Sequence, residues 1–343
     1  MKAVKLTGIK KMETMDVPMP QIANDSDVLI KMGVVGVCGS DIHYYDTGRI
    51  GIQVVEYPFA VGHEGAGVVH EVGSAVKAVK PGDRIVIEPS ISCGECEQCK
   101  AGRPHTCLNN KFLGCPGQIE GNLVEYIIMP ESQCLKLDDN QTLDDGALSE
   151  PLAIGLYANK QAQTQGGEDV AIIGYGPIGM SVMLMGQARG VESFVVSEKI
   201  DARLKLAAET GAELCLNPDV LDVPAELKNQ KKTFDIVFEC CGKQEALDTA
   251  IEIVKPGGKI VIVGIPEFDR WSFTADLARR KEITLIHVRR QNHCTEETLQ
   301  MMKEGKVDAS KMVTHRFSFD DTARSFDMVS NYKDGVMKAM IDF

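Results

Sequence analysis

The sequence predicts a two-domain α/β protein in which a doubly wound parallel sheet is inserted into an irregular, mainly antiparallel β domain. Three observations support this prediction. The 343 residues suit two domains of ordinary size. Roughly the first 150 residues hold short β-branched runs between glycines and prolines, the pattern of strands and turns. After them, strand-like and helix-like segments alternate, which is typical of a parallel sheet covered on both faces.

The first region is expected to contain short strands. Its β-branched runs span 28–35, 67–72, 84–87 and 123–129. Glycine and proline separate the runs, for example at Gly33, Pro81-Gly82 and Gly121, and these residues favour turns. We therefore expect mostly antiparallel strands here, accompanied by short helices.

The middle region begins where alanine and leucine become frequent, shortly after Asp144. Helices are expected at 148–163, 177–189, 201–210 and 244–254. Strands are expected at 169–173, 193–196, 234–238 and 259–263. Beyond residue 284 the pattern is mixed again, and helices are expected at 296–304 and 320–330.

Composition and charge exclude several classes of partner. With 49 acidic against 37 basic residues the net charge is -12, which argues against binding to nucleic acid or to an anionic membrane. No apolar run is long enough for a membrane span. Residues 1–16 lack the apolar core of a signal peptide, so we expect a cytoplasmic protein. The 11 cysteines then indicate thiolate chemistry rather than disulfides.

A glycine-rich turn follows the first strand of the middle region and opens the next helix. Its sequence, Gly174-Tyr175-Gly176-Pro177-Ile178-Gly179, has the pattern G-x-G-x-x-G. Gly174 permits the tight turn, Gly176 lets the backbone approach a pyrophosphate, and Gly179 lets helix and strand pack closely. The helix N-terminus would face the phosphates. A tight turn without a ligand is the alternative.

An acidic residue at the end of the following strand indicates which dinucleotide binds. Glu198 follows Gly179 by 19 residues. A carboxylate there accepts hydrogen bonds from an adenosine ribose and repels a 2′-phosphate. NAD is therefore favoured over NADP, although Lys199 and Arg203 are close in sequence and could soften the preference.

Four cysteines in one loop predict a structural metal site. Cys93, Cys96, Cys99 and Cys107 follow the pattern C-x2-C-x2-C-x7-C. Four thiolates at this spacing can enclose one Zn²⁺ tetrahedrally and leave no position open. An iron–sulfur cluster, disulfides and unrelated cysteines are the alternatives.

A second set of metal-ligating residue types is spread over three segments. These segments are Cys38-Gly39-Ser40-Asp41-Ile42-His43, Gly62-His63-Glu64-Gly65 and Glu150-Pro151-Leu152. One cysteine, one histidine and one or two carboxylates suit zinc with an open coordination position. Each residue alone would be read as core or surface. Beside a nucleotide turn and a separate four-cysteine loop, together they predict a catalytic zinc centre.

These motifs, in this order, resemble the zinc-dependent medium-chain alcohol dehydrogenase family over nearly the whole chain. The segments that carry a closer similarity to its sorbitol (L-iditol) dehydrogenase branch are 43–51, Glu88-Pro89, Glu150-Pro151-Leu152 and 313–317. The resemblance implies a GroES-like catalytic domain at 1–147, a Rossmann NAD-binding domain at 148–285 and a return to the catalytic domain at 286–343. It also implies a homotetramer or homodimer.

The resemblance further implies roles for individual residues. Catalytic zinc would be held by Cys38, His63 and Glu64, with Glu150 as a further ligand or beside a zinc-bound water. A polyol would contact Tyr44, Glu150 and Arg290. The cofactor would be lined by Gly174, Gly176, Pro177, Ile178, Gly179, Glu198, Arg203, Val263, Ile265 and Val288. Two residues depart from the branch pattern: Gln291 stands where tyrosine is usual, which leaves the exact polyol open, and Glu198 replaces the more usual aspartate.

The expected reaction is oxidation of a secondary hydroxyl, with hydride transfer to NAD. Zinc would lower the pKa of the hydroxyl, and Ser40 and His43 would carry the released proton to solvent. Two zinc ions per chain are expected, one catalytic and one structural. Alternative substrates are L-threonine, a butanediol or a sugar phosphate. A nucleotide-binding protein without turnover is the alternative from a different class.

Overall fold

The computed structural model describes all 343 residues and divides them into two compact units. Unit 1 contains Met1–Glu150, Thr295–Glu304 and Val313–Phe343. Unit 2 contains Pro151–Cys294 and Gly305–Met312. Residues 286–294 and 305–312 therefore group with unit 2 and not with the catalytic domain, where the sequence predicts them. The first of these stretches stays in unit 2 because the Val288 amide donates to the Ile262 carbonyl at 2.9 Å.

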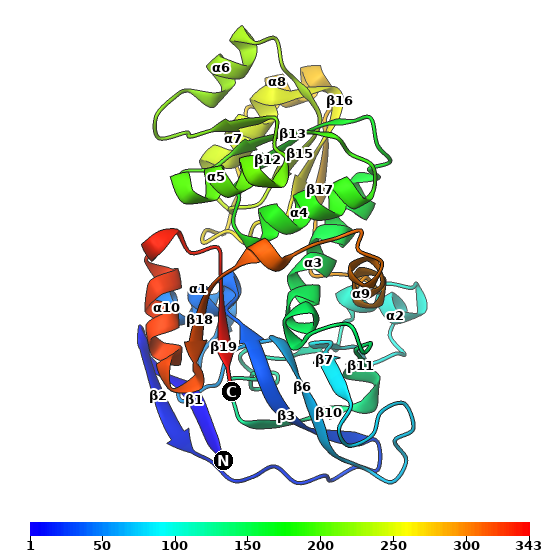
Figure 1. Ribbon diagram of the computed structural model, residues 1–343. Helices are drawn as coiled ribbons and strands as arrows, with labels where there is room; N and C mark the ends of the chain where they lie inside the picture. Colours follow the sequence, from blue (N-terminus) through cyan, green and yellow to red (C-terminus); the bar gives the residue numbers. More distant parts are fainter. The chain divides into compact units, whose positions relative to one another are not determined.

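Unit 1 is built mainly of strands (Figure 1). Its strands are β1 (Lys2–Gly8), β2 (Lys11–Asp16), β3 (Asp27–Gly36), β4 (Arg49–Ile50), β5 (Gln53–Val54), β6 (Glu64–Val72), β7 (Arg84–Ile87), β8 (Ser90–Ile91), β9 (Lys111–Phe112), β10 (Tyr126–Pro130), β11 (Cys134–Lys136), β18 (Val313–Ser318) and β19 (Lys338–Asp342). Its helices are α1 (Gly39–Thr47), α2 (Glu97–Lys100), α9 (Thr295–Lys303) and α10 (Thr322–Ser330). Helix α3 (Leu143–Ala162) begins in unit 1 and ends in unit 2.

The main sheet of unit 1 has seven strands in the order β11-β7-β6-β3-β19-β18, and β10 also pairs with β3. Strand β3 pairs with β6 so that Gly36 lies opposite Glu64. At the same end of β3, the C-terminal strand β19 pairs antiparallel with it, Met340 opposite Gly36. Three segments that are far apart in the sequence thus meet at one end of this sheet. The core beneath it includes the fully buried Leu6, Ile30, Met32, Ile85 and Leu113.

Unit 2 contains one parallel sheet. Its strands are β12 (Asp169–Ile173), β13 (Ser193–Ser197), β14 (Leu214–Leu216), β15 (Phe234–Glu239), β16 (Val254–Ile262) and β17 (Thr284–His287). Its helices are α4 (Pro177–Ala188), α5 (Asp201–Thr210), α6 (Val223–Asn229), α7 (Gln244–Ile253) and α8 (Ala275–Lys281). The strand order is β14-β13-β12-β15-β16-β17, and every pair is parallel.

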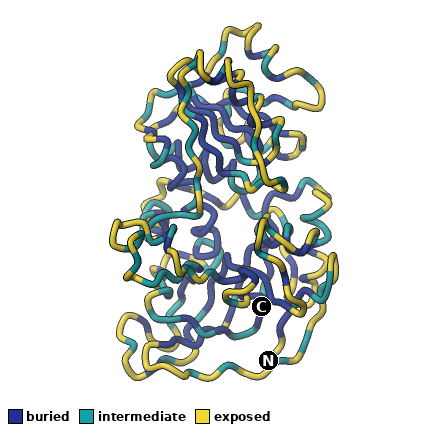
Figure 2. Tube along the Cα trace, turned by 180° about the vertical axis from the view of Figure 1, so that it is seen from behind, coloured by how far each residue is buried: buried dark blue, intermediate teal, exposed yellow.

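Both faces of this sheet are covered, because the helices that connect parallel strands pack on the two faces. On one face, Ala171 and Val195 pack in a cluster with Leu227 of α6 and Leu247 of α7. On the other face, helix α4 lies so close to Phe194 that a Cβ on Gly186 would be 2.8 Å from its ring. Figure 2 shows the strands of both units as largely buried tube. The doubly wound parallel sheet predicted from the sequence is confirmed. No helix of the protein combines the length and apolarity that a membrane crossing requires.

Candidate functional site

Two strands of unit 1 bring the three predicted zinc ligands together. Cys38 lies just beyond β3 and caps helix α1, and Glu64 is the first residue of β6. The Cys38 sulfur, a ring nitrogen of His63 and a carboxylate oxygen of Glu64 all lie within 4.8 Å of one another. His63 and Glu64 are only 5% and 1% exposed. Ligand distances of about 2.0–2.3 Å allow one zinc ion to fit among these atoms.

Asp41 fixes the turn that carries these ligands. It is 1% exposed, and its carboxylate accepts hydrogen bonds from the backbone amides of Cys38, at 3.4 Å, and Gly62, at 3.1 Å. The same carboxylate lies 3.4 Å from Nδ1 of His63. Burial opposes the charged form of His63, but Asp41 and then Cys38 raise its pKa well above the usual value. A carboxylate on Nδ1 leaves Nε2 free to bind a metal, the arrangement common in zinc proteins.

Lys338 of β19 lies on the other side of the cluster. Its Nζ is 2.6 Å and 2.8 Å from the two carboxylate oxygens of Glu64, and both residues are 1% exposed. Burial acts to lower the pKa of Lys338, but the charges of Glu64 and Cys38 raise it overall. The lysine therefore remains protonated and compensates the charge of Glu64. Burial and the Glu64 charge together raise the pKa of the Cys38 thiol.

Glu150 lies near this cluster but is not one of its three converging ligands. It is 7% exposed, and burial is the main reason that its pKa rises to about 7. The charges of Glu64 and Glu88 raise it further, whereas those of His63 and Lys338 oppose the rise. A carboxyl group with such a pKa can exchange a proton near neutral pH.

The four cysteines of the predicted structural site also converge. All four sulfurs lie within 4.8 Å of one another, and Sγ–Sγ distances are 3.6 Å for Cys96–Cys99, 3.8 Å for Cys96–Cys107 and 3.4 Å for Cys93–Cys107. A zinc tetrahedron with Zn–S bonds of about 2.3 Å has edges of about 3.8 Å. All four are free thiols, so the disulfide alternative is excluded.

Backbone amides stabilise negative charge on this loop. Hydrogen bonds from the amides of Glu95 and Cys96 lower the pKa of Cys93. Those from Cys99 and Leu108 lower that of Cys96 to about 6. Burial and the Cys96 thiol raise the pKa of Cys99 to about 11, as expected when close sulfurs compete for negative charge. The loop is thus suited to a cation that would balance several thiolates.

In unit 2, the glycine-rich turn joins β12 to α4 as predicted. Gly174 has φ +90°, and a Cβ there would lie 2.8 Å from Cβ of Cys241, so only glycine fits. A Cβ on Gly179 would collide with the carbonyl oxygen of Gly174. Helix α4 begins at Pro177 with Gly176 as its N-cap. The strand, turn and helix therefore have the geometry that binds a pyrophosphate.

The other predicted cofactor residues lie at the same edge of the parallel sheet. Glu198, just beyond β13, accepts hydrogen bonds from the amides of Tyr175, at 2.7 Å, and Lys199, at 2.8 Å. The Arg203 guanidinium would be 3.4 Å from a Cβ on Gly176, beside the turn. Val263, Ile265 and Val288 follow the C-terminal ends of β16 and β17. Ligands of open α/β sheets bind at this edge.

The predicted substrate residues are divided between the units. Tyr44 lies on α1 of unit 1, and its hydroxyl donates to Oε1 of Gln53 at 3.3 Å. Arg290, with φ +53°, and Gln291 belong to unit 2. The Gln291 side-chain oxygen accepts from the Cys294 amide at 2.7 Å and so closes a turn.

Comparisons with known proteins agree with this geometry. The family model described as Alcohol dehydrogenase GroES-like domain matches residues 24–139, and Zinc-binding dehydrogenase matches residues 177–304. A sorbitol dehydrogenase of Bacillus subtilis is 34% identical over 343 residues, 99% of this chain and 97% of that protein. The chain belongs to the zinc-dependent medium-chain alcohol dehydrogenases. This confirms the predicted family and its pairing of a GroES-like with a Rossmann domain.

Within the medium-chain dehydrogenases, the chain falls in the sorbitol dehydrogenase branch. An L-idonate 5-dehydrogenase of Vitis vinifera is 34% identical over 325 residues, 92% of this chain and 87% of that protein. A solved zinc-binding dehydrogenase of Sinorhizobium meliloti 1021, bound to NADP, superposes with a TM-score of 0.90 at 28% identity, covering 100% of this chain and 99% of that one. A nucleotide cofactor is thus a property of the family.

Sequence reasoning missed two residues that contact the three converging ligands of this dehydrogenase. Asp41 belongs to the segment 38–43, but the sequence alone suggested no role for it. An acidic residue three positions after a helix-capping residue is nevertheless a recognisable capping pattern. Lys338 is a lone lysine in the apolar run Val336–Ile341, a signal for a buried and paired charge.

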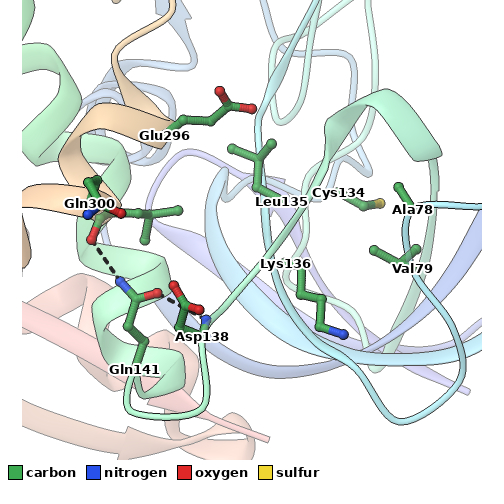
Figure 3. A pocket seen from close by; sticks show the side chains of 10 residues that line it. Ala78, Val79, Cys134, Leu135, Lys136, Asp138, Gln141, Glu296 and Gln300 are labelled. Carbon is green, nitrogen blue, oxygen red and sulfur yellow. Dashed lines mark hydrogen bonds between the residues drawn. The ribbon is translucent and has the colours of Figure 1, made fainter. Parts of the chain in front are cut away.

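A further pocket of about 310 Å³ lies in unit 1 of the dehydrogenase (Figure 3). Gln141 spans part of its wall, accepting from the Asp138 amide at 3.1 Å and donating to the Leu299 carbonyl at 2.9 Å. Burial raises the pKa of its Cys134 thiol to about 12, so this thiol is uncharged at neutral pH. The pocket shares no residue with the two groups of converging metal ligands.

Proposed function

We propose that this medium-chain dehydrogenase oxidises a secondary hydroxyl of a polyol to a ketose and transfers the hydride to NAD. The observation that carries the proposal is the convergence of one cysteine, one histidine and one glutamate in a chain 34% identical to a sorbitol dehydrogenase over nearly its full length. The sequence similarity to an L-idonate 5-dehydrogenase supports a substrate with several hydroxyl groups.

In this proposal, Cys38, His63 and Glu64 hold the catalytic zinc, and the cysteines 93, 96, 99 and 107 hold a structural zinc. When bound, the catalytic zinc supplies a Lewis acid that lowers the pKa of the substrate hydroxyl. Glu150, with its pKa near 7, is proposed to join as a further ligand or to hold a water beside these three residues. The burial of His63, Glu64 and Glu150 excludes bulk water from these three side chains and strengthens their charge interactions.

Two side chains on α1 provide a route for the released proton. The hydroxyl of Ser40 donates to the Cys38 sulfur at 3.4 Å, so it lies beside the proposed substrate position. His43 is three residues further along the helix and therefore on the same face. Ser40 would receive the proton from the substrate side, and His43 would release it toward solvent.

The glycine-rich turn and the sheet edge beside it bind the cofactor in this proposal. NAD, when bound, supplies the hydride acceptor. Glu198 favours it over NADP because a carboxylate near the ribose repels a 2′-phosphate. Arg203 lies beside Gly176 and is proposed to face the bound pyrophosphate. Tyr44, Glu150, Arg290 and Gln291 are proposed to contact the polyol.

We also propose that the chain assembles into a homodimer or homotetramer. Strand β17 is the last strand of its sheet, and an edge strand offers backbone groups to a second chain. Sedimentation velocity should give a mass of two or four chains. A monomer at micromolar concentration would contradict assembly without affecting the proposed chemistry.

A substrate panel run with both NAD and NADP tests the proposed reaction. Sorbitol, xylitol and L-iditol should be oxidised with NAD, and NADP should give lower kcat/KM. L-threonine, 2,3-butanediol and sugar phosphates serve as competing substrates. Turnover of one of these with none of the polyols would overturn the polyol assignment. Cys38→Ser should abolish turnover, whereas Cys215→Ser, which lies outside both groups of converging metal ligands, should retain it.

A further inference from the structure

Strand β19 supplies a buried cation to the proposed catalytic centre. Two of its hydrogen bonds go to Glu64, from Nζ of Lys338 to Oε2 at 2.6 Å and to Oε1 at 2.8 Å. The same nitrogen donates to the backbone carbonyl of Val37 at 3.2 Å. An ammonium has three donors, so one side chain engages both a proposed ligand and the residue before another, Cys38.

We propose that Lys338 is a positioning residue for the catalytic zinc, holding the Glu64 carboxylate and the chain before Cys38 at the spacing that one ion requires. The inference rests on the proposed function, because it takes Cys38, His63 and Glu64 as the zinc ligands. Lys338 itself touches neither substrate nor cofactor in this scheme and acts through Glu64.

The backbone around Glu64 shows why such a contact is needed. Gly36 lies opposite Glu64 across β3 and β6, and a Cβ on Gly36 would collide with Oε2 of Glu64. The absence of a side chain therefore opens the space in which the carboxylate lies. Within that space, Lys338 fixes the carboxylate against rotation and keeps its charge compensated while no metal is bound.

Positioning and simple electrostatics predict opposite effects for the loss of this lysine. A buried positive charge next to the ligands repels a dication, so its removal alone would tighten zinc binding. Loss of positioning would weaken zinc binding, and the residues that orient metal ligands typically contribute 10–100-fold to metal affinity. The sign of the change therefore distinguishes the two roles.

The test measures zinc affinity of the full-length protein by competition with a chromophoric chelator. Lys338→Met should weaken one of two zinc sites by about 10–100-fold and leave the four-cysteine site unchanged. Lys338→Arg, which keeps the charge and can still bind both carboxylate oxygens, should recover most of the affinity. Lys136→Met is the matched control, because it removes a lysine–carboxylate pair of similar length, 2.8 Å to Asp83, away from the metal ligands.

Cobalt substitution gives a second readout that is independent of turnover. The visible absorption of Co²⁺ at the catalytic site should change in Lys338→Met and return toward wild type in Lys338→Arg. If Lys338→Met does not fold, Lys338→Gln replaces it with the same expectation. Unchanged or tighter zinc binding, or an unchanged cobalt spectrum, in a folded Met or Gln variant would overturn the inference. Wild-type protein that binds two zinc ions but oxidises no polyol would overturn only the proposed function.

Discussion

At the scale of single residues, Asp41 contacts the turns of two proposed ligands at once. Its carboxylate accepts from the amides of Cys38 and Gly62 and lies 3.4 Å from Nδ1 of His63. Asp41→Ala removes the acceptor of the Cys38 amide and of the buried Gly62 amide, and it leaves the imidazole without the carboxylate beside Nδ1. We expect zinc affinity of the catalytic site to fall about 10–100-fold, measured by chelator competition.

Two further variants, one conservative and one control, test this prediction. Asp41→Asn keeps one acceptor oxygen and should lose less affinity than the alanine variant. Asp83→Asn, which alters an ion pair with Lys136 away from the site, should behave as wild type. An Asp41→Ala protein with wild-type zinc affinity would show that the geometry of the turn does not depend on this carboxylate.

Glu150 leads to a pH-dependent prediction for the metal-free protein. Its pKa in the fold is about 7, whereas an unfolded glutamate ionises near 4.3. A raised pKa means that the fold favours the protonated form, so this stability is present below pH 4.3 and is lost as pH rises through 7. Glu150→Gln should therefore stabilise the metal-free protein at pH 8 relative to wild type, by up to about 3 kcal/mol.

Urea unfolding of the chelator-treated proteins at pH 5 and pH 8 measures this difference. The advantage of the Gln variant should be larger at pH 8 than at pH 5, because at pH 5 the wild-type side chain is still mostly protonated in the fold. Equal differences at both pH values would mean that Glu150 does not ionise in this range.

At the scale of elements, the turn between β12 and α4 depends on one left-handed glycine. Gly174→Ala places a Cβ 2.8 Å from that of Cys241 at φ +90°. We expect NAD affinity to fall at least tenfold, because the turn must shift away from the pyrophosphate position. Fluorescence titration with NADH gives the affinity.

Gly167→Ala is the matched control for this turn. Gly167 has nearly the same backbone angle, φ +87°, but a Cβ there meets nothing within 4 Å. Both variants should lose about 1–2 kcal/mol of stability from the left-handed backbone. Only Gly174→Ala should lose NADH affinity, and an equal loss in both would trace the effect to backbone strain alone.

Most of the elements of unit 2 could be predicted from the sequence, whereas the C-terminal strands could not. The strand at 169–173 and the helix at 201–210 have the predicted bounds, since periodicity and flanking turns define them locally. Helix α3 begins at Leu143 instead of 148, where Thr142 and Asp145 exchange capping hydrogen bonds, and it continues past Pro151. The strand predicted at 123–129 is shorter in the structure, β10 beginning only at Tyr126.

The proposed catalytic site likewise contains residues that could be predicted from the sequence and contacts that could not. Its ligands could be predicted because each stands in a short glycine-containing motif, and the structure brings Cys38, His63 and Glu64 together. The Lys338–Glu64 pair spans 274 residues, and local patterns carry no information about which strands pair over such a separation. Glu64 is one of the three converging ligands and Glu150 is not. This difference depends on distances in the folded chain, which the spacing of residues along the sequence does not encode.

At the scale of the whole molecule, we expect the two proposed zinc sites to bind their ions independently of each other. Cys96→Ser removes one sulfur from the four-cysteine loop and should reduce zinc from two ions per chain to one, measured by mass spectrometry of the metal content. The melting temperature should fall, because a structural ion stabilises only the folded loop. Cys215→Ser should keep both ions, and a Cys96→Ser chain with two ions would contradict the assignment.

The position of β19 also bears on how the protein is made. Glu64 leaves the ribosome well before Lys338, and at about 5–20 residues per second the intervening 274 residues take roughly 15–55 s to synthesise. During that interval the nascent carboxylate lacks its cation, and β3 lacks a neighbour. In the proposed scheme, the set of residues that holds the catalytic zinc is therefore complete only after β19 has been synthesised.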